Sequence, residues 1–199
     1  MGRYLGPHNK IARSLNFKAF GKSFEKKYDK EKSVVFKHRF PQKTEYGCLL
    51  ATKKKILLLY GLREKYLRTI LKKAALQKKN LEDTLIAFIE SRLDNIVYRL
   101  NFAKTRSMCR QLVVHKHILV NDKVVNIPSY MVKIGDKISY NKNILGNTNL
   151  VANFNDEVNI YPWLQLDTAK KVGTVIDIPE KADIPEKIRW KDIIEFYSR

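Results

Sequence analysis

The hydrophobic pattern of this chain changes its period near residue 117, and this change limits the folds that the chain can adopt. Between residues 44 and 115, apolar residues recur every three or four positions, as on one face of a helix. From Ile118 onward they form short runs separated by turn residues, which is typical of strands. Helices followed by strands along the chain predict an α+β protein.

Four helices are expected before the change of period, at residues 44–60, 63–79, 82–100 and 105–115. Thr44 and Thr105 are suited to begin the first and the last of them, because a threonine hydroxyl accepts a hydrogen bond from the first turn of a helix. Gly61 fits the end of the first helix. We expect the first two helices to form an antiparallel pair with basic side chains on the outside.

Strands are expected at Ile118–Val120, Lys123–Ile127, Lys137–Tyr140 and 173–179. The dipeptide Asn121-Asp122 suits the positive φ angles of a two-residue hairpin, and Gly135-Asp136 marks a second turn. Residues 188–199 are predicted to form a helix that docks on the rest of the chain.

The positive charge of the chain is concentrated in its first two-fifths. The net charge is +19 over 199 residues, and residues 1–80 hold 22 Lys/Arg against 5 Asp/Glu. Residues 81–140 hold 9 against 6, and residues 141–199 hold 8 against 9. A basic N-terminal part of this kind predicts a polyanionic partner such as nucleic acid.

Several other classes of protein do not fit the sequence. No apolar run approaches the ~20 residues of a membrane span, and the N-terminus has no apolar core of a secretory signal. Cys48 and Cys109 are too few for a Cys-only zinc site. His115 and His117 would point to opposite faces of a strand, with no third ligand nearby in sequence. We therefore expect no metal and no cofactor.

Arg106 and Arg110 lie one turn apart on the predicted helix at 105–115, beside an apolar arc that includes Cys109 and Leu112. Like charges at this spacing repel each other by a few tenths of a kcal/mol, so an anion is expected to compensate them. We predict that the two arginines face solvent on the exposed edge of this helix and together bind a phosphate, because the planar guanidinium donates two hydrogen bonds at once. Ordinary solvation, or a salt bridge to Asp94 or Asp122, is the alternative.

The segment at residues 91–130 carries a resemblance to a known family. It reads SRLDNIVYRLNFAKTRSMCRQLVVHKHILVNDKVVNIPSY and resembles the S4 RNA-binding domain. The flanks RYLGPHNKIAR, TEYGCLLATKKK, YGLREKYLR and IIEFYSR are similar to bacterial-type ribosomal protein S4 of the small subunit, with the spacing of bacteroidete members. The segment VVFKHRFPQK at 34–43 departs from the family, because it lacks the glycines of the usual turn.

The resemblance implies two lobes. Residues 1–89 would form a basic N-terminal arm and a mainly helical lobe, completed by a C-terminal helix at 188–199. Residues 90–187 would form a second lobe that contains the S4 domain at about 91–140, with short helices packed on a small antiparallel sheet.

The resemblance also implies a function. The chain would be a structural component of the small ribosomal subunit, in the cytoplasm or in an organelle. It would bind 16S ribosomal RNA as a primary binding protein, nucleate assembly of the subunit body, contact ribosomal protein S5 and other small-subunit proteins, and contribute to translational accuracy. No enzyme activity, membrane or small-molecule substrate is implied.

The residues expected to contact RNA are those that match the family pattern, together with nearby lysines. They are Arg3, Tyr4, Gly6, Pro7, Lys10, Arg13, Tyr46, Lys53, Lys54, Arg68, Lys72, Arg106, Arg110, Gln111, His115 and Lys116.

Three other interpretations fit the sequence less well. S4 domains also occur on RNA-modifying enzymes such as pseudouridine synthases, but residues 141–199 are too short for a catalytic domain and show no glycine-rich phosphate loop. A free-standing RNA-binding protein would not need the basic residues 1–80. DNA binding lacks a helix-turn-helix pattern with base-reading side chains.

Overall fold

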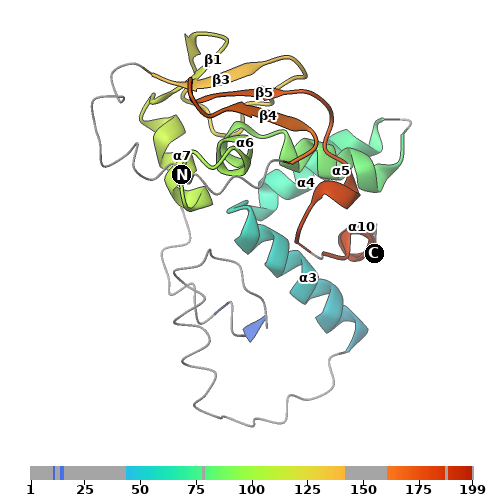
Figure 1. Cartoon of the computed structure of the whole chain (residues 1–199). Coiled ribbons are helices and arrows are strands. Elements are labelled where there is room, and N and C mark those ends of the chain that lie inside the picture. Colours follow the sequence, from blue (N-terminus) through green and yellow to red (C-terminus); the bar gives the residue numbers. More distant parts are fainter. Residues whose placement is uncertain are drawn as a thin grey trace. The chain divides into compact units, whose positions relative to one another are not determined.

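The computed structural model describes residues 11, 14–15, 44–77, 79–141, 161–186 and 188–198. They fall into two compact units, each described by itself (Figure 1). The helical unit consists of both chain ends, Met1–Lys72 and Lys187–Arg199, and the sheet unit is Lys73–Glu186. The helices and the antiparallel sheet confirm the predicted α+β class.

The described part of the helical unit consists mainly of α3 (Glu45–Leu59), the beginning of α4 (Glu64–Ala75) and α10 (Trp190–Ser198). Thr44 caps α3, and its hydroxyl oxygen accepts a hydrogen bond from the backbone N–H of Gly47 at 3.2 Å. After α3 the chain turns at Gly61, whose φ of +59° is readily adopted by glycine. The predicted beginning and end of the first helix are confirmed.

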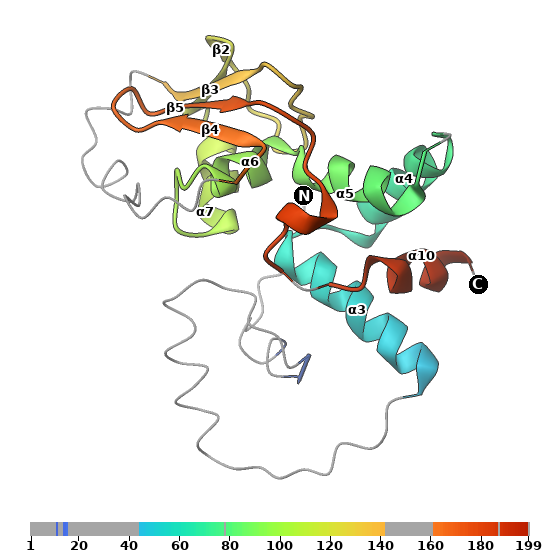
Figure 2. The same cartoon turned by 45° about the vertical axis from the view of Figure 1, so that its right-hand side comes forward.

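The main partner of α3 is α10, so the expected antiparallel pair of α3 and α4 is wrong (Figures 1 and 2). The Thr52 hydroxyl donates to the Asp192 carboxylate at 3.0 Å, and the rings of Tyr60 and Trp190 lie 6.2 Å apart. Trp190 is almost fully buried. A tryptophan buries a large apolar area, so the C-terminal helix covers the apolar side of α3 on which α4 was expected to pack.

The sheet unit contains two helices where one was expected at 82–100. They are α5 (Leu81–Glu90) and α6 (Leu93–Arg99). Between them Arg92 has extended backbone and forms an isolated β-bridge with Met131. The backbone N–H of Leu93 donates to the carbonyl of Tyr130 at 2.9 Å. These partners from a distant segment take up the first donors of α6, which separates it from α5 in spite of the continuous apolar pattern.

The helix α7 (Arg106–Val114) follows α6 and begins as predicted. The hydroxyl oxygen of its N-cap, Thr105, accepts a hydrogen bond from the backbone N–H of Met108 at 3.2 Å. Cys109 and Leu112 are buried in the core of the sheet unit, so the predicted apolar arc of this helix is confirmed.

The described strands form one antiparallel sheet with the order β2-β1-β3-β5-β4. Their bounds are Ile118–Val120 for β1, Lys123–Val124 for β2, Lys137–Tyr140 for β3, Leu164–Asp167 for β4 and Val172–Val175 for β5. The hairpin between β1 and β2 has positive φ angles at Asn121 and Asp122, 49° and 62°, as its sequence predicts. Three details differ from expectation: β2 and β5 are both shorter than predicted, and β4 was missed.

The core of the sheet unit lies between one face of the sheet and the helices α6 and α7 (Figure 2). Ile118 and Ile138 are fully buried there, on neighbouring strands. Gly173 of β5 packs so closely on Leu100 that a Cβ atom at this position would lie 2.3 Å from a Leu100 methyl carbon. This contact explains a glycine in the middle of a strand.

No helix in the described parts of the chain is both long and apolar enough to cross a lipid bilayer.

Candidate RNA interface

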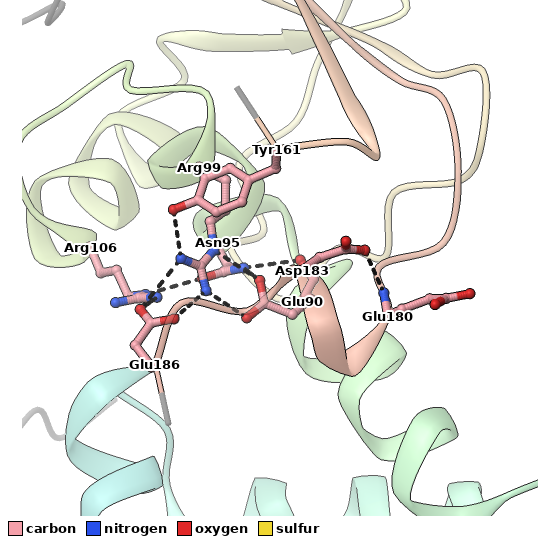
Figure 3. Close-up of polar contacts among 8 residues, drawn as sticks. All are labelled: Glu90, Asn95, Arg99, Arg106, Tyr161, Glu180, Asp183 and Glu186. Atoms are coloured by element: carbon pink, nitrogen blue, oxygen red, sulfur yellow. Dashed lines mark hydrogen bonds and ion pairs between the residues drawn. The ribbon is translucent and has the colours of Figure 1, made fainter. Parts of the chain in front are cut away.

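A network of charged side chains in the sheet unit joins α6 and α7 to Glu90 and Glu186 (Figure 3). Arg99 is at its centre, with Nη2 2.8 Å from Glu90 Oε1 and 2.8 Å from Glu186 Oε2. The other oxygen of Glu186, Oε1, lies 2.9 Å from Arg106 Nη2. Arg106 Nε also donates to Asn95 Oδ1 at 3.1 Å. The carboxylate of Glu186 therefore supplies the anion that Arg106 requires.

The Glu186 carboxyl is mostly removed from water. Burial alone raises its pKa, but the positive charges of Arg106 and Arg99 outweigh this effect, so the pKa lies below its ordinary value of 4.5. Glu186 is therefore a carboxylate at neutral pH and a full counter-charge to the two arginines.

A second charged group surrounds Asp94. Arg92 donates to both oxygens of this carboxylate, at 3.0 and 2.7 Å. Arg110 Nη1 lies 3.5 Å from Asp94 Oδ2. Of the two acids expected as alternatives to phosphate, Asp94 is thus the one that Arg110 contacts.

The two arginines of α7 differ in accessibility. The side chain of Arg106 is 13% exposed, and its guanidinium carbon lies 4.2 Å from the centre of the Tyr98 ring. The side chain of Arg110 is 26% exposed. The expectation that both form a solvent-facing pair is wrong for Arg106, because Glu186, Asn95 and Tyr98 surround its guanidinium.

The edge of α7 and the residues that follow it are exposed to solvent. We use the name "α7 edge" for Gln111, His115 and Lys116, whose side chains are all exposed. The His115 ring stacks on His117 with centroids 6.0 Å apart. Among the described residues no group of three or more His, Cys, Asp or Glu side chains could hold a metal ion.

The helical unit presents further basic side chains, and Lys54, Arg68 and Lys72 are exposed as expected for RNA contacts. Arg68 Nη2 lies 2.9 Å from Glu64 Oε1, and this hydrogen bond lowers the pKa of the Glu64 carboxyl. Tyr46 is 56% exposed. These positions are compatible with RNA contact, which stays a prediction for each of them.

Lys53 is placed differently from the expectation. It is 7% exposed, and its Nζ lies 3.3 Å from Glu64 Oε1 and 4.3 Å from the centre of the Phe196 ring. A buried ammonium with a carboxylate and an aromatic partner holds α3 to its neighbours. Lys53 is therefore a structural residue of the helical unit and not a surface ligand for phosphate.

The remaining expected contacts, Arg3, Tyr4, Gly6, Pro7, Lys10 and Arg13, lie outside the described residues, as does the segment 34–43.

The sequence did not predict the structural partners of Arg106. Asn95 and Arg99 stand in the SRLDN-x-V-x-R pattern, which was taken as a family signature without a role for each residue. Glu186 gave no local signal, because it is 80 residues from Arg106. The available clue was the position of Arg92 and Asp94 within the apolar pattern of residues 82–100, because charged residues are seldom buried without a partner.

Comparison with known proteins assigns the family. The family model "Ribosomal protein S4/S9 N-terminal domain" matches residues 3–90, and the model "S4 domain" matches residues 91–138. The chain is 42% identical to the small ribosomal subunit protein uS4 of Phocaeicola vulgatus and 43% identical to that of Bacteroides fragilis, with 100% of each chain covered. It is 39% identical to uS4 of Amoebophilus asiaticus, again over 100% of both chains. Similarity of this extent establishes that the chain belongs to the family of the small ribosomal subunit protein uS4.

Proposed function

We propose that this chain is a structural protein of the small ribosomal subunit that binds 16S ribosomal RNA and has no enzyme activity. The observation that carries the proposal is the identity of about 40% to uS4 relatives along the whole chain. The uneven charge supports it, because 22 Lys/Arg against 5 Asp/Glu in residues 1–80 suit a large polyanion better than a small ligand.

RNA contact is proposed at two surfaces. The first is the α7 edge in the sheet unit, together with the partly exposed guanidinium of Arg110. The second is the basic side of α4, with Arg68 and Lys72. We further propose that the chain engages RNA through two lobes, residues 1–89 with 188–199 and residues 90–187. This boundary lies later in the chain than the division at Lys72 between the two compact units.

The finer role of the chain follows from the family. We infer that it binds 16S RNA early, nucleates assembly of the subunit body, contacts ribosomal protein S5 and contributes to translational accuracy. Its place of action would be the ribosome, in the cytoplasm or in an organelle.

The identity of the bound RNA tests this proposal. The tagged full-length chain is purified from its own cells at moderate salt, and the RNA that copurifies is sequenced. Small-subunit ribosomal RNA is the expected product, and the chain should sediment with small subunits in a sucrose gradient. The tag alone and an Ile118→Asp variant, which introduces a charge into the core of the sheet unit, serve as controls. Recovery of tRNA or of mixed messengers would contradict the proposal and favour a free-standing RNA-binding protein.

A further inference from the structure

The segment 180–186 is fastened to the helices of the sheet unit at both of its ends. At its beginning, Lys181 Nζ lies 2.5 Å from Glu82 Oε1 of α5. Lys181 begins a short 3-10 helix, Lys181–Asp183, and the backbone N–H of Glu180 donates to Asp183 Oδ2 at 3.0 Å (Figure 3). At its end, Glu186 reaches Arg99 of α6 and Arg106 of α7. This segment therefore joins three helices by charged contacts.

Glu186 is itself held firmly in place by Arg99. The Arg99 side chain is 2% exposed, and its guanidinium also contacts Glu90 at 2.8 Å and the Tyr161 hydroxyl at 3.1 Å. A guanidinium with partners on several sides has little freedom to move, so the carboxylate that it binds is fixed as well. The position of the Glu186 carboxylate is thus determined by the core of the sheet unit.

Arg106 connects the fixed Glu186 carboxylate to α7, because Arg106 is the first residue of that helix. Its guanidinium contacts Glu186 at 2.9 Å and Asn95 at 3.1 Å. The α7 edge begins little more than one turn further along the same helix, at Gln111. We propose that Glu186 is a positioning residue for RNA binding, which holds α7 through Arg106 so that the α7 edge is presented to RNA. This inference rests on the proposed function.

A competing role for Glu186 makes the opposite prediction. If Arg106 were a phosphate ligand, the Glu186 carboxylate would compete with RNA for its guanidinium. Replacing Glu186 with Gln would then release Arg106 and raise RNA affinity. If Glu186 positions α7, the same replacement loosens the helix and lowers RNA affinity. The sign of the change separates the two roles.

The test uses the full-length chain and a transcript of small-subunit ribosomal RNA. We expect Glu186→Gln to weaken binding by about threefold or more, as for residues coupled through a shared contact. Asp83→Asn is the matched control, because it removes a negative charge from an exposed residue of the same unit. This control should leave affinity unchanged or raise it slightly. Equal changes in RNA affinity for the two variants would mean that Glu186 affects binding only through the net charge of the protein, and this result would overturn the proposal.

A double variant and the salt dependence give a second, independent readout. Arg106→Gln and Glu186→Gln break the same contact. The double variant should therefore bind RNA with the same affinity as whichever single variant binds RNA less tightly. A direct phosphate contact by Arg106 would instead make the salt slope of Arg106→Gln shallower by about 1. Additive losses together with a shallower slope would overturn the positioning role.

Folding is checked on every variant, because both residues lie in a buried network. Binding is measured below the melting temperature, with circular dichroism confirming the parental helix content. Glu186→Asp keeps the charge and shortens the side chain, so it is expected to fold and to lose less affinity than Glu186→Gln. If the parent binds this RNA and folded Glu186→Gln binds it equally well, the positioning role is wrong while the proposed function stands. If the parent itself does not bind, the proposed function fails.

Discussion

Arg106 and Arg110 lie on the same helix but differ in their surroundings, since Arg106 is enclosed by partners and Arg110 is partly exposed. Their spacing correctly indicated that anions must compensate them, and both find carboxylates, Glu186 and Asp94. Sequence alone could not decide between carboxylate and phosphate, because the acid that holds Arg106 is remote in sequence. Burial separates the two residues: Arg106 is enclosed, and Arg110 is twice as exposed.

Alanine substitution at each position makes this difference measurable. Arg106→Ala is expected to lower the free energy of unfolding by about 1–3 kcal/mol, because it leaves buried polar partners unsatisfied. Arg110→Ala should cost less than about 1 kcal/mol, as a long contact of a partly exposed pair does. Urea denaturation of the two variants and the parent checks both values. Small and equal losses would instead fit the expected phosphate-binding pair on an exposed edge of the helix.

The stability of the protein should also respond to the ionisation of Glu186. A carboxyl whose pKa is lowered by folding stabilises the fold above its unfolded-state pKa, and this contribution disappears as pH falls through the folded-state pKa. The parent should therefore be more stable than Glu186→Gln at pH 7, and the difference should shrink as pH falls below 4.5, the ordinary value for this group.

Denaturation of the parent and Glu186→Gln at a series of pH values from neutral to acidic tests this dependence. Asp83→Asn again serves as the control, since its exposed carboxyl has no comparable set of partners among the contacts described above. A difference between parent and Glu186→Gln that stays constant across the whole pH range would exclude a charged role for Glu186.

At the scale of helices and strands, local sequence was sufficient where a turn or a cap determines the element. Thr44, Thr105 and the Asn121-Asp122 hairpin were all located correctly, because each acts on residues beside it in the chain. Local sequence was not sufficient to predict an element whose end depends on hydrogen bonds to a segment far away in the chain. The break between α5 and α6 depends on backbone partners near residue 130, and no pattern within 82–100 reveals it.

The strand β4 was missed for a related reason. Its four residues, Leu164–Asp167, alternate apolar and polar, which is a strand pattern, but the run is the shortest that this pattern can indicate. They form a strand by pairing with β5 across a short connection, with Gln165 opposite Thr174. The pairing partner therefore determines this strand more than its own short sequence does.

The sheet gives a prediction at this scale. Ile118→Asp is expected to unfold the sheet unit, because Ile118 is fully buried between β3 and the helices and an unpaired buried charge is costly. Lys123→Asp, at an exposed position of β2, is the control and should keep the parental melting temperature. Thermal melts of both variants decide the matter. Parental melting of Ile118→Asp would mean that the assignment of β1 to the core is wrong.

At the scale of the whole molecule, charge is the feature that sequence predicted most directly. Composition alone indicated a polyanionic partner, and the family assignment agrees with this. What composition could not supply is the division of roles among the basic residues. Lys53 and Arg106 are held inside the fold, whereas Lys54 and Lys116 are exposed.

RNA binding by the whole chain should depend strongly on salt. Each phosphate neutralised adds about −0.7 to −0.9 to the slope of log K against log salt, so several contacts give a slope steeper than about −2. Deleting residues 1–42, which hold 11 Lys/Arg against 3 Asp/Glu, should make the slope markedly shallower. The sheet unit should stay folded, because its core residues all come later in the sequence. Binding titrations at several salt concentrations, with circular dichroism of the shortened chain, check both statements.

Glu186 is far from Arg106 in sequence, so the ribosome synthesises the arginine well before its carboxylate partner. Arg106 and Glu186 are 80 residues apart, and at roughly 5–20 residues per second the carboxylate follows the arginine by about 4 to 16 s. During that interval the nascent chain holds α7 without its counter-charge. The strand β3 also waits for β5, its neighbour in the finished sheet, and presents an open edge to other chains. A ribosome that stalls before residue 172 thus leaves β3 with an unpaired edge and α7 without its carboxylate partner. Synthesis of β5 then covers the edge of β3, and synthesis of Glu186 completes the contact with Arg106.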